Sequence, residues 1–317
     1  MNPHIVALGE PMVEFSAVEA GPLRAVESFR RGWGGDTSNF AVAAARLGET
    51  VGYVCRLGDD EWGRSFLELW AAEGIDTSRV VLDREGYTGV YWIARRPGGD
   101  HEFTYIRRGS AASRLRPEDL DPEYLRSARL LHTSGITQAI SPSACDTVFA
   151  AIAAARAGGA VVSYDPNLRL KLWSLERARA VILHTVSLVD IVLPNLEEAR
   201  LLTGLDDPDA VADRFLELGA GLVALKMGPH GCLLARSGER VRVPAYPVPV
   251  VDTSGAGDAF DAGLAVGYLA GLDLEGIARL ANATGALAAT GYGCVTPLPR
   301  RAAVEALIGG ALTRRGP

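Results

Sequence analysis

Short apolar runs alternate along this chain with longer stretches in which apolar residues recur at helical spacing. Such runs are typical of buried strands, and the longer stretches of amphipathic helices. Strands are predicted at 4–8, 51–55, 130–133, 161–164, 190–193 and 222–226, and a hairpin at 231–243. Helices are predicted at 39–47, 61–73, 142–157, 174–185, 196–202, 209–218, 274–290 and 300–312. These repeated units predict one α/β domain spanning 1–317, with a doubly wound, mostly parallel sheet flanked by helices.

Two stretches interrupt this alternation. Residues 88–95 and 102–107 have a strand-like pattern on either side of a turn signal, Pro97-Gly98-Gly99-Asp100. This arrangement predicts a β-hairpin inserted into the α/β chain. Residues 12–33 are irregular and partly strand-like. We predict that a small separate sheet is formed by about 12–33 and 86–110.

Composition removes several classes of protein. The chain has 317 residues, is 48% hydrophobic and carries a formal net charge of -6, which argues against nucleic acid as its main partner. Its apolar runs are too short to span a membrane, and its first residues do not resemble a signal peptide, so we expect a cytoplasmic protein. The four cysteines are far apart, without metal-ligand spacing. Lysine occurs only at Lys171 and Lys226.

The most informative stretch follows the apolar pair Val250-Val251 and reads Asp252-Thr253-Ser254-Gly255-Ala256-Gly257-Asp258. Its two glycines let the backbone turn tightly and direct amides toward one point. A helix predicted from about Asp258 adds partial positive charge there, which makes an anion site suited to phosphate. Beside such a site Asp258 is either a base for phosphoryl transfer or only a helix cap. The stretch alone leaves both interpretations open.

Other nucleotide and hydrolase motifs are missing from the sequence. It contains no Gly-x-x-x-x-Gly-Lys-Ser/Thr, which excludes a P-loop NTPase. No Gly-x-Gly-x-x-Gly follows the first predicted strand, which disfavours a Rossmann oxidoreductase. A Gly-x-Ser-x-Gly elbow is also missing, which disfavours an α/β-hydrolase.

Two blocks resemble the signatures of PfkB-type (ribokinase-like) sugar kinases. The stretch 252–258 is similar to the C-terminal signature, and Gly34-Gly35-Asp36-Thr37-Ser38-Asn39 is similar to the N-terminal one. The resemblance covers essentially the whole chain. It implies a ribokinase-like fold in which the small sheet is a β-lid over the sugar site. It also implies that Asp258 is the catalytic base, that the amides of Gly255, Ala256 and Gly257 form the anion hole, and that Gly34, Gly35 and Asn39 form the sugar-binding turn.

The resemblance also implies the cofactors ATP and Mg²⁺. Asn195 and Glu198 match an Asn-x-x-Glu segment that acts on Mg²⁺ and phosphates through water, although a helix cap followed by a solvated turn explains the same residues. The segment 226–231 resembles the loop that covers the nucleotide. In that loop Lys226, Gly228 and Gly231 would bind ATP, whereas Asn282 either lines the adenine pocket or is a polar spot on a helix. Whether a monovalent cation binds near Asp252 stays open.

Three blocks resemble those of 2-keto-3-deoxygluconate kinases. They are Thr88-Gly89-Val90-Tyr91, the Tyr105-Ile106-Arg107-Arg108-Gly109-Ser110-Ala111-Ala112 block, and the block 165–173. They imply that the sugar is bound by Tyr91, Tyr105, Arg107 and Arg169. The chemistry agrees, because the carboxylate of a sugar acid needs a charge-assisted arginine contact that a neutral sugar does not need. A solvated charge pair on an edge strand is the alternative for Arg107 and Arg108.

One segment departs from this resemblance. Residues 290–297 lack the acidic residue that ketodeoxygluconate kinases commonly carry there. The alternative substrate is therefore a neutral sugar such as fructose, and a non-catalytic sugar sensor is a remote alternative. The apolar strand with Tyr91, Trp92 and Ile93 looks exposed, and bare apolar edges tend to pair, so we expect a homodimer or higher oligomer formed through the lid.

Overall fold

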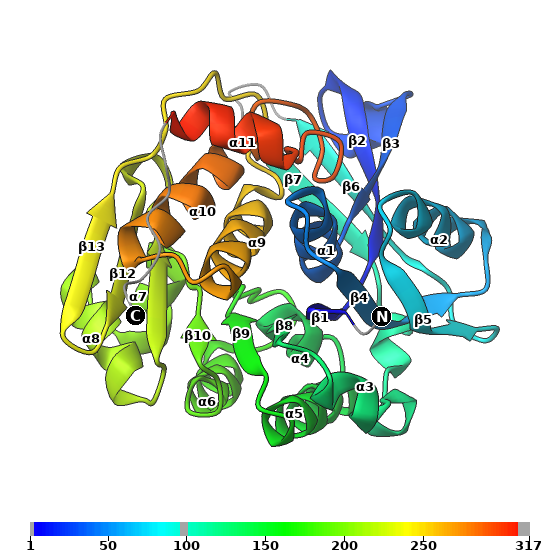
Figure 1. Cartoon of the computed structure of the whole chain (residues 1–317). Helices are drawn as coiled ribbons and strands as arrows, with labels where there is room; N and C mark the ends of the chain where they lie inside the picture. Colours follow the sequence, from blue (N-terminus) through cyan, green and yellow to red (C-terminus); the bar gives the residue numbers. More distant parts are fainter. Residues whose placement is uncertain (1–2, 96–100, 310–317) are drawn as a thin grey trace.

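A sheet of nine strands runs through the molecule (Figure 1), in the computed structural model that describes residues 3–95 and 101–309. Its strand order is β13-β12-β11-β10-β9-β8-β1-β4-β5. The strands are β1 (Ile5–Leu8), β4 (Val51–Gly58), β5 (Asp76–Asp83), β8 (Leu130–Ser134), β9 (Val161–Asp165), β10 (Ile191–Val192), β11 (Leu222–Lys226), β12 (Cys232–Arg236) and β13 (Glu239–Val243). Strands β5 to β11 pair in parallel, whereas β12 and β13 form the predicted hairpin. The doubly wound, mostly parallel sheet is confirmed, although the sequence pattern does not predict β5.

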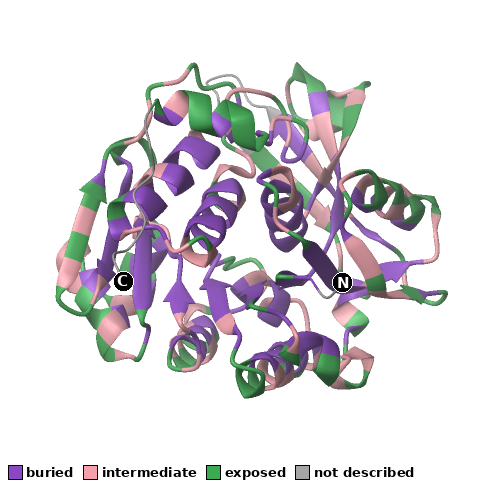
Figure 2. Cartoon of the chain, in the orientation of Figure 1, coloured by how far each residue is buried: buried purple, intermediate pink, exposed green. Residues whose placement is uncertain are grey.

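Helices cover both faces of this sheet. They are α1 (Asp36–Arg46), α2 (Glu61–Ala72), α3 (Pro122–Arg126), α4 (Gly135–Ala139), α5 (Pro142–Ala157), α6 (Leu175–Val186), α7 (Leu196–Thr203), α8 (Pro208–Glu217), α9 (Ala256–Leu269), α10 (Leu274–Ala288) and α11 (Arg301–Ile308). Alternate residues of β1 enter opposite cores: Ile5 and Ala7 pack with α1, α9 and α10, and Val6 and Leu8 with α5, α6 and α8. Burial on both faces explains why β1 is apolar at every position. Figure 2 shows that α1, α9 and α10 are mostly buried.

A second sheet of four strands lies beside the first. Its order is β3 (Phe29–Gly34), β2 (Met12–Ala20), β6 (Gly89–Arg95) and β7 (His101–Ile106). Since β2 and β7 flank β6, the side chains of Tyr91 and Ile93 are buried, and the expectation that this strand is an exposed edge is wrong. The predicted turn 97–100 and the end of the helix predicted to 312 lie outside the described residues.

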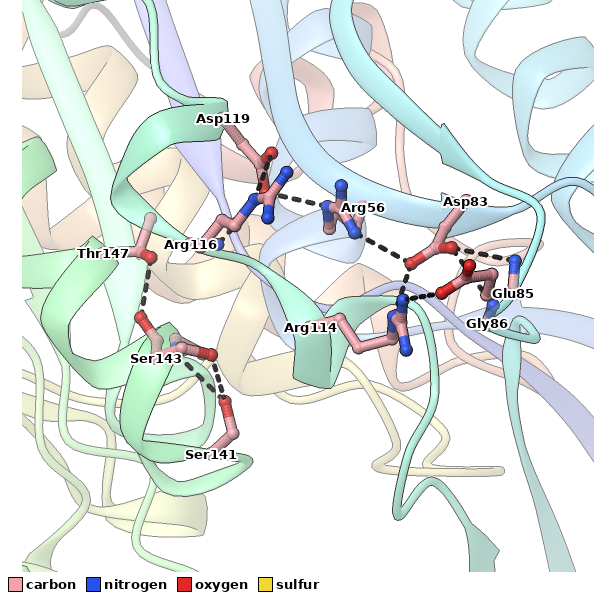
Figure 3. Close-up of polar contacts among 11 residues, drawn as sticks. Arg56, Asp83, Glu85, Gly86, Arg114, Arg116, Asp119, Ser141, Ser143 and Thr147 are labelled. Atoms are coloured by element: carbon pink, nitrogen blue, oxygen red, sulfur yellow. Dashed lines mark hydrogen bonds and ion pairs between the residues drawn. The ribbon is translucent and has the colours of Figure 1, made fainter.

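An ion-pair network ties the base of this small sheet to the central one (Figure 3). The carboxylate of Asp83, at the end of β5, accepts hydrogen bonds from Arg56, from Arg114 and from the amides of Glu85 and Gly86. The amides of Glu85 and Gly86 precede β6, and Arg114 follows β7. The buried carboxylate of Asp83 therefore binds both segments that connect the small sheet to the central one. Arg56 also pairs with Asp119.

Helix starts differ from the predicted ones at two important places. Helix α1 begins at Asp36 with Gly35 as its N-cap, three residues before the predicted start at residue 39. Helix α9 begins at Ala256 with Gly255 as its N-cap, so the interpretation of Asp258 as a cap is wrong. Among the residues that the structure describes, there is no helix that combines the length and apolarity needed to cross a membrane.

Candidate active site

The glycine turn 253–258 is built by close packing that only glycine permits. Gly255 has a left-handed conformation with φ 75°, and a Cβ there would lie 2.9 Å from the carbonyl oxygen of Cys294. Asp258 follows in the first turn of α9. The amide of Ala256 donates to the Thr253 carbonyl at 3.2 Å, so it closes the turn and is not open to an anion, contrary to its predicted place in the anion hole.

Asn39 and Asp258 meet although 219 positions separate them. The Nδ2 group of Asn39 donates to Oδ2 of Asp258 at 2.8 Å, which joins the first turns of α1 and α9. Oδ1 of Asn39 is buried without a hydrogen-bond partner among the described residues. An orphaned acceptor beside a carboxylate suits a ligand that brings a hydroxyl group.

The surroundings of Asp258 favour its protonated form more than water would. Burial and then the negative charge of Asp36 raise the pKa of Asp258 to about 7, although the hydrogen bond from Asn39 opposes the shift. Asp36 is itself a buried carboxylate at the start of α1. A carboxyl group with this pKa can accept and release a proton near neutral pH.

The pair Gly34-Gly35 joins the small sheet to α1, since Gly34 is the last residue of β3 and Gly35 is the N-cap of α1. A Cβ on Gly34 would stand 2.2 Å from the hydroxyl oxygen of Tyr91, and one on Gly35 would stand 2.2 Å from the carbonyl oxygen of Glu10. Gly35 also has φ 97°, which disfavours other residues. The predicted sugar-binding turn is therefore closely packed between Tyr91 of the small sheet and the backbone at Glu10.

Arg107 lies at the end of β7 and is mostly buried. Its guanidinium group pairs with the buried carboxylate of Glu10, and its Nε has no hydrogen-bond partner among the described residues. It therefore is not a solvated pair with Arg108 on an edge strand. Ser110 also donates to Glu10, at 3.3 Å.

Arg169 is exposed and donates to the carbonyl of Leu168 at 3.0 Å. Burial raises the pKa of Tyr105, and the positive charges of Arg169 and Arg107 oppose that rise. Both guanidinium groups therefore act on the same phenol. The rings of Tyr105 and Tyr91 stack with centroids 5.8 Å apart.

A buried carboxylate on the small sheet accompanies Tyr91. The hydroxyl group of Tyr91 donates to Oε2 of Glu14 at 2.7 Å, and the thiol of Cys294 donates to the same oxygen at 3.2 Å. Glu14 is only 2% exposed. Cys294 belongs to the segment 290–297 that lacks an acidic residue, and this segment contacts acidic groups from elsewhere: Glu14 on β2, and Asp252, whose Oδ2 accepts from the Gly293 amide at 3.1 Å.

The side predicted to bind the nucleotide contains a reciprocal helix cap. Asn195 Oδ1 accepts from the Glu198 amide at 2.9 Å, and Glu198 Oε1 accepts from the Asn195 amide at 2.7 Å. The other oxygen of Glu198 accepts from the Leu168 amide at 2.8 Å. The capping interpretation is thus correct. Because Asn195 Oδ1 and both oxygens of Glu198 already accept hydrogen bonds, only their remaining lone pairs could contact a metal. Burial and then the charge of Asp165 raise the pKa of Glu198 to about 7.

Lys226 ends β11 and points into a buried acidic cluster. Its Nζ lies 2.9 Å from Oδ2 of Asp165 and 3.0 Å from Oδ1 of Asp261. Burial alone would raise the pKa of Asp165, but the charge of Lys226 and the hydrogen bonds from Asp261 and Lys226 together outweigh burial and lower it. The loop after Lys226 turns at Gly228, with φ 56°, and at Gly231, with φ 84°.

Asn282 on α10 holds the chain that follows β13. Its Nδ2 donates to the carbonyls of Val243 and Pro244, at 3.0 and 3.1 Å. A Cβ on Gly231 would meet the same Val243 carbonyl at 2.0 Å. Asn282 and Gly231 therefore pack around one backbone segment, and Asn282 is more than a polar spot on a helix.

Comparison of the whole sequence with known protein families identifies the family of this chain. Residues 2–301 match the family described as pfkB family carbohydrate kinase. The chain belongs to this family. Carbohydrate kinases are phosphotransferases, so this pfkB kinase is an enzyme of that class, and the ribokinase-like resemblance is confirmed.

Relatives of this kinase differ in the sugar they are named for. It is 35% identical over 308 residues to a 2-dehydro-3-deoxygluconokinase of Thermoproteus tenax, covering 96% of this chain and 94% of that protein. It is also 35% identical over 315 residues to fructokinase-1 of Oryza sativa subsp. japonica, covering 96% and 97%. A solved fructokinase of Vibrio cholerae O395, in fructose, ADP and calcium ion bound form, has a TM-score of 0.87 and 28% identity, covering 97% of this chain and 100% of that one.

Sequence reasoning about this kinase misses four acidic residues of the site: Glu10, Glu14, Asp36 and Asp261. Glu10 and Glu14 lie at or near the start of β2, where the sequence pattern is irregular. A glutamate flanked by apolar residues in a strand, as Glu14 is, is the signal that could have identified it. Asp261 follows Asp258 by three positions and therefore shares its helix face. Their partners are distant in sequence, so the contacts themselves are not predictable from spacing.

Proposed function

We propose that this pfkB kinase transfers the γ-phosphoryl group of ATP to a primary hydroxyl group of a sugar acid, with 2-keto-3-deoxygluconate as the first substrate to test. The observation that carries the proposal is the contact between Asn39 and Asp258 at the start of α9. It brings a carboxyl group able to titrate near neutral pH to a helix N-terminus that attracts phosphate.

Asp258 acts as the general base in this reaction. Its carboxylate takes the proton of the attacking hydroxyl group, while Asn39 fixes its orientation. The amides of Gly255 and Gly257 face the transferred phosphoryl group and stabilise the charge on it. The small sheet serves as a lid that excludes water, so that the sugar and not water accepts the phosphoryl group.

The sugar carboxylate binds between Arg107 and Arg169. The joint action of their charges on Tyr105 supports this, because it indicates that both lie near one phenol. The open Nε of Arg107 is a buried donor that a ligand carboxylate would satisfy. Tyr91 and the turn at Gly34 and Gly35 form the wall beneath the sugar.

A neutral ketohexose is the second candidate, and two contacts favour it. Glu10 already neutralises Arg107, and Glu14 places a buried carboxylate beside Tyr91. A carboxylate accepts hydrogen bonds from sugar hydroxyls but repels a sugar acid. The fructokinase relatives agree with this candidate.

ATP and a divalent metal are the cofactors of the proposed reaction. Among the described residues no group of three or more His, Cys, Asp or Glu side chains is arranged to hold a metal directly. Asn195 and Glu198 use their oxygens in the helix cap and fit a Mg²⁺ ion that keeps its own waters and the nucleotide phosphates as ligands. When bound, the metal neutralises phosphate charge. The proposed ATP site is lined by Lys226, Gly228, Gly231 and Asn282.

An assay of purified protein with ATP, Mg²⁺ and a panel of sugars tests the proposal. We expect a higher kcat/KM for 2-keto-3-deoxygluconate than for fructose or ribose. A preference for fructose would refute the sugar-acid proposal and favour a neutral sugar whose hydroxyl groups donate to Glu14. Tight sugar binding without ADP formation would instead indicate a sensor. Sedimentation of the same sample tests the proposed homodimer through the lid, whose outermost strands are β3 and β7.

A further inference from the structure

Lys226 is held by two carboxyl groups from different elements. Its ammonium nitrogen lies 2.9 Å from Asp165, at the end of β9, and 3.0 and 3.2 Å from the two oxygens of Asp261 on α9. The side chains of Lys226, Asp165 and Asp261 are 13%, 6% and 1% exposed. A lysine normally has a flexible stem and a mobile charge, so two buried partners fix a charge that would otherwise move.

This ammonium group lies against the glycine turn. A Cβ built on Gly257 would meet Nζ of Lys226 at 3.7 Å and no other heavy atom of the described residues within 4 Å, apart from those of its chain neighbours and its own helix. The space in front of Gly257 is therefore open, and Lys226 forms its wall. Asp261 follows Asp258 by three residues, which puts the proposed base and the anchor of the lysine on one face of α9.

We propose that Asp261 is a positioning residue for phosphoryl transfer, because with Asp165 it holds the ammonium group of Lys226 at the open space before Gly257. There the fixed charge faces the γ-phosphoryl group of ATP. The inference rests on the proposed function, since it assumes that a phosphoryl group enters this space. A charge already in place costs no reorganisation when negative charge develops, which is the condition for strong electrostatic stabilisation.

The pKa values of the two carboxyl groups are shifted in opposite directions. Burial raises the pKa of Asp261 well above its usual value despite the charge of Lys226, whereas Lys226 lowers that of Asp165. Asp261 then binds Lys226 as an acceptor while sharing a hydrogen bond with Asp165. An asparagine can make both contacts, but an alanine can make neither.

The variants Asp261→Ala and Asp261→Asn test this role. We expect Asp261→Ala to lower kcat about tenfold and to weaken binding of β,γ-imido-ATP about tenfold, with ADP affinity and the KM for sugar unchanged. Asp261→Asn should stay within about threefold of wild type, since it preserves the contacts. In a Lys226→Met background the effect of Asp261→Ala should disappear.

A purely structural role gives a different result. Asp119→Ala also removes a buried carboxylate from a basic partner, outside the site, and controls for a general loss of stability. Wild-type kcat and an unchanged preference for β,γ-imido-ATP over ADP in Asp261→Ala would overturn the proposal. An equal loss of kcat on Asp261→Ala in the wild-type and Lys226→Met backgrounds would also overturn it.

The chain offers a second measurement if Asp261→Ala does not fold. Lys171 and Lys226 are its only lysines, so ¹³C-labelled lysine gives two sets of signals, and Lys171→Arg assigns them. In wild type the Lys226 signal should shift with β,γ-imido-ATP more than with ADP, and an unmoved signal would overturn the proposal. This readout needs no sugar. Loss of all sugar phosphorylation with a moving Lys226 signal would therefore refute only the proposed function.

Discussion

The raised pKa of Asp258 predicts that the rate depends on pH near neutrality. A general base must be deprotonated before it accepts a proton, so kcat/KM follows the ionised fraction of Asp258 in the free enzyme. With a pKa of about 7, roughly a tenth of the molecules are ionised at pH 6 and roughly nine-tenths at pH 8. An aspartate with its ordinary pKa would be ionised throughout this range.

The sign of each neighbour's contribution makes the prediction specific. The charge of Asp36 raises the pKa of Asp258, so Asp36→Asn should move the acid limb of the profile to lower pH. The charge of Lys226 lowers it, so Lys226→Met should move the limb to higher pH, whatever that variant does to the maximal rate. The two substitutions act in opposite directions on the same group.

Initial rates with limiting sugar and saturating ATP, measured between about pH 5.5 and 8.5, give the profile. The nucleotide also titrates, but equally in every variant, so only the differences between variants report Asp258. A profile that is flat from pH 6 to 8, or an Asp36→Asn profile that coincides with wild type, would refute the reasoning. Asp119→Asn, which changes a buried carboxylate in the network of Figure 3, should leave the limb in place.

Three further predictions follow from single contacts. Asp258→Asn should lower kcat by about 10²- to 10⁴-fold while calorimetry shows unchanged binding of β,γ-imido-ATP; wild-type turnover would remove Asp258 from the chemistry. Gly255→Ala should cost more stability in urea than Gly238→Ala, because both have φ 75° but only Gly255 has a backbone oxygen 2.9 Å from the new Cβ, and equal losses would contradict this. Asp83→Asn should lower the free energy of unfolding by about 1–3 kcal/mol, whereas Glu61→Gln in an exposed pair should change it by less than about 0.5 kcal/mol.

Local chemistry alone determined much of this protein. The alternation of apolar runs and helical stretches predicts the main sheet because a strand buried on both faces must be apolar throughout, as β1 is. Gly255 and Asp258 were recognisable because a tight turn before a helix needs glycine and an anion site follows from it. These features depend only on neighbours in sequence.

The chemistry of the site was decided by contacts that only the folded chain makes. Asn39 meets Asp258 and Arg107 meets Glu10 across 219 and 97 positions, and these contacts determine which groups are buried together. Burial and neighbouring charge then set the pKa of Asp258, and the fold pairs Arg107 with the buried carboxylate of Glu10, which no local pattern specifies. The sequence thus determined most of the strands and the glycine turn, and it indicated Asp258 as a candidate base. The tertiary structure decided their protonation and their partners, because electrostatic interactions depend on distance and burial in space and not on separation along the chain.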